Sequence, residues 1–248
     1  MTATTTAVVA PDRSTFGADI AHTLRLIVVA GVTCGALVVG VGSRLAMLLL
    51  RVTTGPEVHG VESDDGFRIG QVTLSGTYSL LSLGAGVGVI GASAYLLVRT
   101  WLIGPQWLRR ATTGAASAAV AGAMLVHDDG IDFHLLTPTW LAIGLFVALP
   151  GLFGVAIAVT VDRFEAHLDV RTASFWWPPL VLLALFPFVL AIMPFVAAGV
   201  LAVTSASSTD GWRRVRSHRG VRVGVRAVWA SVAVLGLLAL VSDVVAIV

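Results

Sequence analysis

The sequence predicts an all-α integral membrane protein, a polytopic bundle of five to six transmembrane helices with a proline-broken fifth segment. Hydrophobic residues make up 56% of the 248 residues and charged residues only 12%, against about 45–50% and 25% in typical soluble proteins. The apolar residues also gather in long runs without charges. This composition excludes a disordered chain and almost any soluble enzyme domain.

The apolar runs define the predicted helices. A bilayer core of about 30 Å needs about 20 apolar residues in a helix, and backbone polar groups in lipid must bond within their own helix. Runs near this length occupy residues 26–50, 76–98, 137–161, 177–203 and 225–247, and a shorter run rich in alanine and glycine occupies 111–126. We expect residues 1–20, rich in threonine and alanine, to form a flexible tail, and residues 21–248 to form a single transmembrane domain.

Small residues recur at helical spacing in three of these runs. The three stripes are Gly31 with Gly35, then Gly84 with Gly88 and Ala92, and finally Gly114 with Ala118 and Gly122. Small residues four apart allow the backbones of two transmembrane helices to approach closely. We therefore expect these stripes to lie in helix–helix contacts.

The fifth segment, residues 177–203, carries four prolines, two of them near its middle. Proline inside a helix removes a hydrogen bond and kinks or breaks the helix, so Pro187 and Pro194 are the predicted breaks. Two halves of about 12 residues are too short to span separately. They suit a re-entrant hairpin, and the alternative interpretation is one kinked transmembrane helix.

The distribution of arginine favours the hairpin. All 16 basic residues are arginine, and short cytoplasmic loops are enriched in basic residues. With the N-terminus in the cytoplasm and six spanning segments, the cytoplasmic side holds 7 arginines and the outer side 8. If the segment 177–203 returns to its own side, the counts become 13 and 2. We therefore predict a multi-pass protein of the cell membrane with a cytoplasmic N-terminus.

The first and last helices each carry a charge inside their apolar run, near its far end. Arg44 lies about 27 Å along the first helix from Leu26, and Asp243 lies about 25 Å along the last helix from Arg226. A charge near lipid needs a partner, and in the hairpin topology both residues reach the outer interface. We predict that Arg44 and Asp243 form a structural ion pair. Alternatively, Arg44 and Arg51 would hold an anionic group, because they are seven residues apart and therefore lie on one face of the helix.

An acidic segment between the third and fourth runs is the candidate metal site. Its ligands would be His127, Asp128, Asp129, Asp132 and His134. Imidazole with carboxylate suits zinc, whereas carboxylates alone suit calcium or manganese. The alternative interpretation is a solvated turn, because Asp-Asp-Gly is a common turn composition.

A basic segment before the last run is the candidate lipid-binding or anion-binding site. It contains Arg213, Arg214, Arg216, Arg219 and Arg222 beside Trp212. Arginines next to an apolar span are attracted to anionic lipid head groups, and they also set topology. We expect lipid rather than nucleic acid as the partner.

The sequence carries no motif that assigns a reaction or a cofactor. None of the 6 histidines lies in the middle of a run, as bis-histidine haem ligation would require, so we predict no cofactor. The favoured function is a non-catalytic membrane protein, which would be a scaffold, an assembly factor or a sensor-like subunit that packs with other subunits or with itself. One alternative is a small-solute or ion transporter built on the broken segment. Another is a metal-dependent membrane enzyme that uses the acidic segment.

Overall fold

The predicted all-α membrane bundle is confirmed by the computed structural model. The structure describes residues 13–54, 73–126, 137–167, 177–207 and 218–247, and it contains only helices and short connections in these ranges. Five of the helices are long and apolar enough to cross a membrane. The protein is therefore a multi-pass helical membrane protein.

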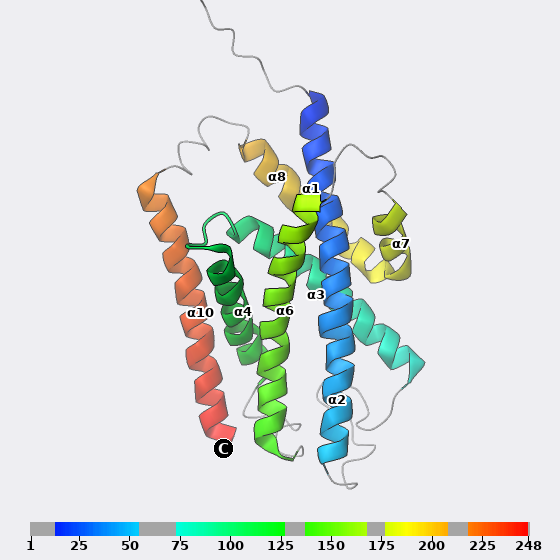
Figure 1. The fold of residues 1–248 in the computed structure, drawn as a ribbon, viewed down its shortest axis with the longest axis vertical. Helices are drawn as coiled ribbons and strands as arrows, with labels where there is room; N and C mark the ends of the chain where they lie inside the picture. Colours follow the sequence, from blue (N-terminus) through cyan, green and yellow to red (C-terminus); the bar gives the residue numbers. More distant parts are fainter. Residues whose placement is uncertain (1–12, 55–72, 127–136, 168–176, 208–217, 248) are drawn as a thin grey trace, which may run out of the picture.

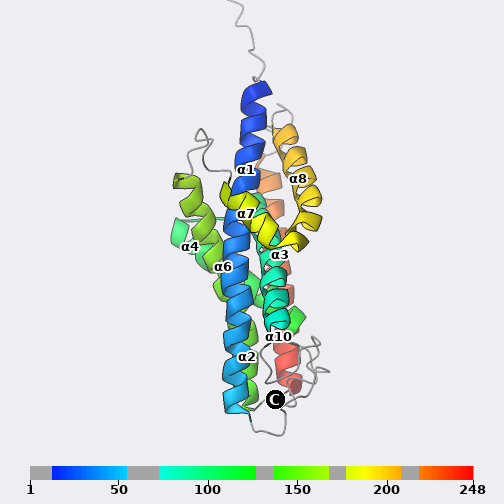
Figure 2. The same cartoon turned by 90° about the vertical axis from the view of Figure 1, so that its right-hand side faces the viewer.

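The first apolar run lies in one continuous rod of three segments. These are α1 (Arg13–Cys34), the wide π-helical turn η1 (Gly35–Val41) and α2 (Gly42–Thr53). Residues 13–20, which we expected within a flexible tail, are helical. The stretch Phe16–Thr53 has 38 residues, about 57 Å of helix, so it exceeds a bilayer core of about 30 Å. The rod projects beyond the other helices at its beginning, which we call the N-terminal end of the bundle (Figures 1 and 2).

Four further helices run alternately between the two ends of the bundle. Helix α3 (Leu74–Val98) runs towards the N-terminal end and α4 (Gln106–Leu125) runs away from it. Helix α6 (Thr139–His167) returns to the N-terminal end, and α10 (Arg219–Ile247) leaves it again (Figure 1). Helix α4 packs between α6 and α10, although it is not among the five helices that are long and apolar enough to cross a membrane.

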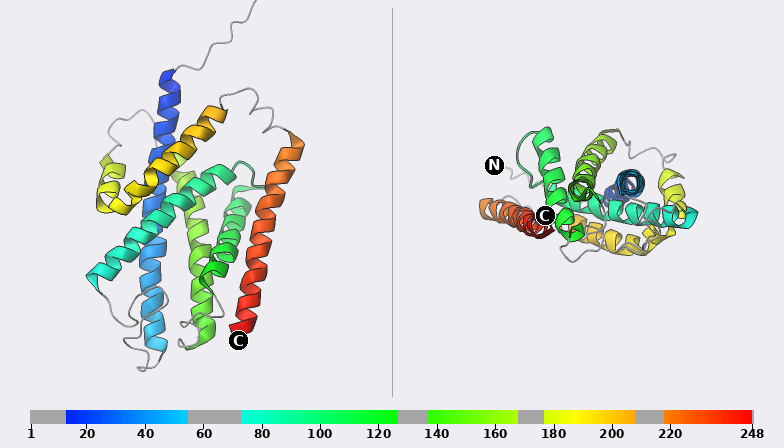
Figure 3. Two further views of the ribbon diagram at one scale, coloured as in Figure 1. Left: turned by 180° about the vertical axis from the view of Figure 1, so that it is seen from behind. Right: turned by 90° about the horizontal axis from the view of Figure 1, so that it is seen from below.

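The fifth apolar segment is broken into a helical hairpin. Helix α7 (Trp177–Leu185) and α8 (Pro187–Ser207) are separated by Phe186. Helix α7 runs away from the N-terminal end, and α8 runs back towards it (Figures 1 and 3). The predicted proline-broken segment is thus confirmed, with Pro187 as the first residue of α8. The second predicted break does not occur, because α8 continues through Pro194.

Tyr78 of α3 secures this break. Its hydroxyl donates a hydrogen bond of 3.0 Å to the carbonyl oxygen of Leu185, the last residue of α7. Its ring is stacked on Phe186, with 6.3 Å between the ring centroids. The backbone nitrogen of Phe186 donates to Leu182, and the Phe186 oxygen accepts from Val189. The carbonyls of Leu185 and Phe186 and the N–H of Phe186 are thus bonded inside the protein, as backbone groups in lipid require.

The rod and α3 cross at the predicted glycine stripes. A Cβ atom on Gly35 would lie 1.9 Å from the carbonyl oxygen of Gly84, and one on Gly88 would lie 1.9 Å from the carbonyl oxygen of Gly31. Such contacts are possible only without a Cβ atom. The two backbones therefore touch directly, and the prediction that these stripes lie in helix contacts is confirmed.

The small-residue stripe on α4 contacts two neighbouring helices, α6 and α10. A Cβ atom on Gly114 would meet Val155 and the carbonyl oxygen of Gly151, both on α6. One on Gly122 would touch Leu240 of α10, 3.4 Å away. This stripe, too, lies in close helix contacts.

Burial is uneven between the helices. Of the most apolar window of each helix, 61% is buried in the first rod but only 6% in α8 and in α10. The largest buried cluster joins α1, α3, α6 and the hairpin, with Val32, Val89, Ile157 and Val189 at its centre. Helices α8 and α10 therefore present most of their apolar surface outwards.

Candidate functional site

Polar side chains gather where α3 ends, α4 begins and α6 ends. We call this group the polar cluster; it comprises Tyr95, Arg99, Gln106, Arg109, Arg110, Asp162 and Glu165. Tyr95 and Arg99 are four residues apart on α3, and Asp162 and Glu165 are three apart on α6, so each pair shares one helix face. The cluster lies at the N-terminal end, at the depth where apolar runs give way to polar residues.

Asp162 is the centre of the polar cluster. Its Oδ1 accepts a hydrogen bond of 3.0 Å from the Tyr95 hydroxyl, and its Oδ2 accepts one of 3.0 Å from Gln106 Nε2. Arg110 donates to Oδ2 from Nε at 3.3 Å and from Nη2 at 3.2 Å. The Asp162 side chain is only 15% exposed. One carboxylate thus ties α3 and α4 to α6.

Arg99 and Glu165 form a two-pronged ion pair beside Asp162. Both terminal nitrogens of Arg99 donate to Glu165, with 2.6 Å between Nη2 and Oε1. The hydrogen bond to Glu165 raises the pKa of Arg99 above its usual range, against the opposing effect of burial. The geometry is the bidentate form that gives direction as well as energy. The pair fixes the last turn of α6 against the end of α3.

Arg109 leaves the cluster with a positive charge that is not neutralised. Its Nε atom is buried and has no hydrogen-bond partner among the described residues. Arg109 lines an open cleft of about 400 Å³ together with Arg99, Gln106, Asp162 and Glu165. The two carboxylates of this cleft are already paired with Arg99 and Arg110. The cleft can therefore attract an anion from the aqueous side.

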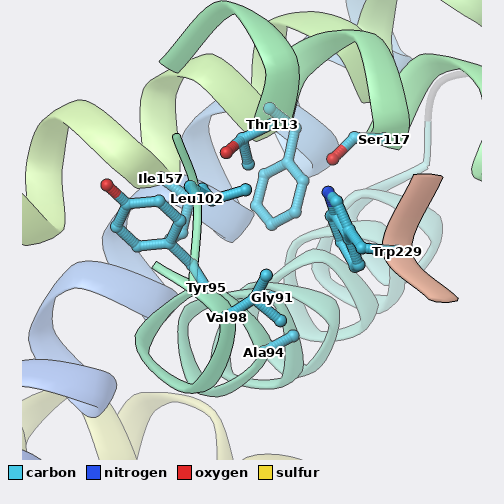
Figure 4. A pocket seen from close by; sticks show the side chains of 10 residues that line it. Gly91, Ala94, Tyr95, Val98, Leu102, Thr113, Ser117, Ile157 and Trp229 are labelled. Carbon is cyan, nitrogen blue, oxygen red and sulfur yellow. The ribbon is translucent and has the colours of Figure 1, made fainter. Parts of the chain in front are cut away.

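A second, apolar crevice lies on the other side of Tyr95. It has a volume of about 80 Å³ and lies between α3, α4, α6 and α10 (Figure 4). Gly91 and Ala94 of α3 form one wall, Phe153 of α6 another, and Trp229 of α10 stands at its side. Tyr95 lines this crevice and bonds to Asp162 in the open cleft. The Tyr95 side chain thus contacts both the apolar crevice and a carboxylate of the open cleft.

Most of the predicted metal and lipid residues fall in ranges that the structure does not describe. His127, Asp128, Asp129, Asp132 and His134 lie outside the described residues, as do Arg213, Arg214 and Arg216. Arg219 and Arg222 are described, and both are exposed in the first turn of α10. Within the described ranges, no three histidine, cysteine, aspartate or glutamate side chains are close enough to hold a metal ion.

The predicted ion pair between Arg44 and Asp243 is wrong. Both residues are described, but neither takes part in the ion pairs Arg99–Glu165 and Arg110–Asp162, and the buried Nε and Nη2 atoms of Arg44 donate to no described residue. The reason is that α10 packs on α4 and α2 packs on α6, so that α4 and α6 stand between α10 and α2 (Figure 1).

Arg44 lies instead against the beginning of α3. Its Nη2 atom would be 2.6 Å from a Cβ atom placed on Gly76. Its Nε and Nη2 atoms are buried and donate to no residue in the described part of the chain. A cation beside a helix N-terminus also opposes the helix dipole. Among the described residues, Arg44 thus has the positive end of a helix dipole beside it and no acidic partner.

The sequence analysis missed the polar cluster. Its arginines enter the sequence analysis only as charges that set the topology, and Tyr95, Gln106, Asp162 and Glu165 are assigned no role there. A signal was available, because a carboxylate such as Asp162 at the end of an apolar run needs a partner. Arginines stand at the ends of five of the six runs, however, and the sequence does not say which run packs beside which.

Comparison with known proteins gives no assignment. No protein-family model matches the chain, and no curated protein or solved structure matches it. The function is therefore argued from the fold and the site.

Proposed function

We propose that this membrane protein is a non-catalytic subunit of a membrane complex. The observation that supports this proposal most directly is the set of hydrogen bonds that Asp162 accepts. This carboxylate accepts from Tyr95, Gln106 and Arg110, which belong to two other helices. A general acid or base has to be free to reach a substrate proton. Asp162 instead acts as a fixed joint between helices.

The break in the hairpin supports the same function. Transporters use the carbonyls freed at a broken helix to coordinate ions. Here the Leu185 carbonyl accepts from Tyr78 and the Phe186 carbonyl accepts from Val189. The break is used to turn the chain.

Helix α8 offers the surface on which a partner would pack. Ala198, Ala202 and Ser205 are exposed on it at spacings of four and three, hence on one face. A Cβ atom on Gly199 would meet nothing within 4 Å. In the rod, α3 and α4, glycines at this spacing are covered by neighbouring helices. Small residues on an uncovered face suit the close approach of another transmembrane helix.

Photo-crosslinking in native membranes tests this proposal. A photoreactive residue at Ala198 or Ala202 is expected to yield one discrete protein adduct. The same residue at Leu152, which is 61% exposed on α6, serves as the matched lipid-facing control. With the photoreactive residue placed at Ser205 on the same face, the double substitution Ala198→Leu/Ala202→Leu is expected to abolish the adduct and to shrink the native complex. Adducts with lipid alone from α8 would contradict the proposal.

A second candidate function is transport, favoured by the hairpin of α7 and α8, which would be re-entrant if both of its ends lie on one side of the membrane. Re-entrant segments often line the path of a solute. Reconstituted liposomes would show solute or ion flux that Pro187→Ala and Pro194→Ala change. Flux that is absent, or unaffected by both substitutions, counts against transport.

A further inference from the structure

One face of α10 combines positive charge with an aromatic side chain. Arg222, Arg226 and Trp229 are spaced by four and three residues, so they share a face of the helix. Trp229 lines the apolar crevice. Arg226 Nε donates a hydrogen bond of 2.9 Å to the carbonyl oxygen of Trp101, the residue before Leu102, which also lines the crevice. The two arginines therefore lie at the end of the crevice that faces the aqueous boundary.

The charge on this face is not balanced by the described chain. The Trp101 carbonyl is a neutral acceptor, and the two carboxylates of the polar cluster are paired with Arg99 and Arg110. Arg222 and Arg226 also lie in the first two turns of α10, where the helix dipole is positive. An anion at this position would be attracted by both the side chains and the dipole.

The crevice below the arginines is suited to hydrocarbon. Its walls include Val98 of α3, Phe153 and Ile157 of α6 and the indole of Trp229 (Figure 4). Ala94, on its rim, is exposed, so the crevice opens on the outer surface of the bundle. In a membrane this surface faces lipid, so a chain inside the crevice is stabilised by van der Waals packing against its walls.

We propose that this crevice holds one acyl chain of an anionic phospholipid, with the phosphate bound by Arg222 and Arg226. Charge-assisted hydrogen bonds from arginine to phosphate fix the head group. The chain then lies along Ala94, Val98 and Trp229, towards the interior of the bilayer. This lipid site uses residues of α10 and α3, and none of the α8 residues of the proposed assembly face line it.

Quenching of Trp229 fluorescence tests the lipid site. The full-length protein is reconstituted with phosphatidylglycerol or phosphatidylcholine that carries bromine on the acyl chains, and the Trp229→Phe variant isolates the signal of Trp229. Saturable quenching is expected at a lower mole fraction of phosphatidylglycerol. Each arginine contact is expected to contribute about fivefold to this preference. Equal quenching by the two lipids would overturn the head-group assignment, and quenching that does not saturate would overturn the site.

Matched variants separate the two parts of the site. Arg222→Gln is expected to lower the phosphatidylglycerol preference about fivefold, while Arg51→Gln at the opposite end leaves it unchanged. Arg222 is exposed, so its substitution spares the fold, whereas Arg226→Gln also removes a bond to Trp101. Ala94→Phe is expected to abolish saturable quenching, and Val87→Phe, on an exposed part of α3 outside the crevice, is expected to retain it. Unchanged quenching in Ala94→Phe would overturn the acyl-chain site.

Discussion

At the scale of single residues, the glycines of the first crossing decide how close two helices come. Gly35 faces Gly84, and Gly88 faces Gly31, each with room for a hydrogen atom and no more. The neighbouring atoms are backbone, so they cannot move aside without shifting a whole helix. An added methyl group would therefore separate the rod from α3.

Substitution of these glycines is the first prediction. Gly35→Ala and Gly88→Ala are each expected to lower the free energy of unfolding in detergent by about 1–3 kcal/mol, the usual cost of overpacking a core. Gly199→Ala on α8, where a Cβ atom meets nothing within 4 Å, is the control and is expected to change little. Equal thermal stability of the three variants would refute the crossing.

Asp162 is the second residue on which the bundle depends. Asp162→Asn keeps the size of the side chain but removes the charge that binds Arg110. It also replaces one carboxylate oxygen, which has two acceptor lone pairs, by an NH2 group that accepts no hydrogen bond. We expect a loss of roughly 1–3 kcal/mol in the free energy of unfolding, as for a buried donor left unpaired. Asp19→Asn, at an exposed position of α1, is the control. A variant as stable as the wild type would show that the polar cluster is not a structural joint.

At the scale of elements, the hairpin of α7 and α8 depends on a contact far away in the sequence. Proline explains why α8 begins at Pro187, since its ring fits the first turn of a helix. It does not explain where the hairpin docks. Tyr78 does, because its hydroxyl and its ring both contact the turn at Leu185 and Phe186.

Removal of this hydroxyl is the third prediction. Tyr78→Phe retains the stacked ring and is expected to lower stability by about 0.5–1.5 kcal/mol, the net value of one hydrogen bond. Tyr78→Leu removes the ring as well and is expected to have a larger effect. Limited proteolysis of the hairpin, followed against temperature, measures both. If Tyr78→Phe equals the wild type, the bond does not hold the turn.

At the scale of the whole molecule, the positions of the helices follow from the sequence more readily than which helices pack side by side. Long uncharged runs and small-residue stripes report local and pairwise constraints, so the helices, the break near Pro187 and the glycine contacts were predicted. Which helices lie side by side depends on the sum of many contacts. For that reason Arg44 was assigned to Asp243 across two intervening helices, and Tyr95, Asp162 and Glu165 were not recognised as one cluster.

The arrangement of arginines leads to the fourth prediction, which concerns topology. In the described ranges, Arg99, Arg110 and Arg226 are among those at the N-terminal end, whereas Arg51 lies at the opposite end. By the positive-inside rule we expect the N-terminal end in the cytoplasm and the C-terminus outside.

Labelling of single cysteines with an impermeant thiol reagent measures this topology, on a Cys34→Ser background. Intact cells are expected to label Thr53→Cys and Ile247→Cys, whereas Asp19→Cys, Ser205→Cys and His218→Cys react only after the cells are opened. Labelling of Ser205 from outside, with Asp19 protected, would show that α7 and α8 cross the membrane.

The wide turn at Gly35–Val41 sets how far α2 is rotated about the axis of the rod relative to α1. A helix advances about 100° per residue, so deletion of one residue from this turn would swing all of α2 by about a quarter of a revolution. Leu50 would then leave the buried cluster to which it belongs with Val126, Ala142 and Leu240, at the opposite end. Gly31, which precedes the turn, would keep its contact with α3. The packing of α2 at one end of the protein can thus be disrupted while the crossing of α1 with α3 at the other end is retained.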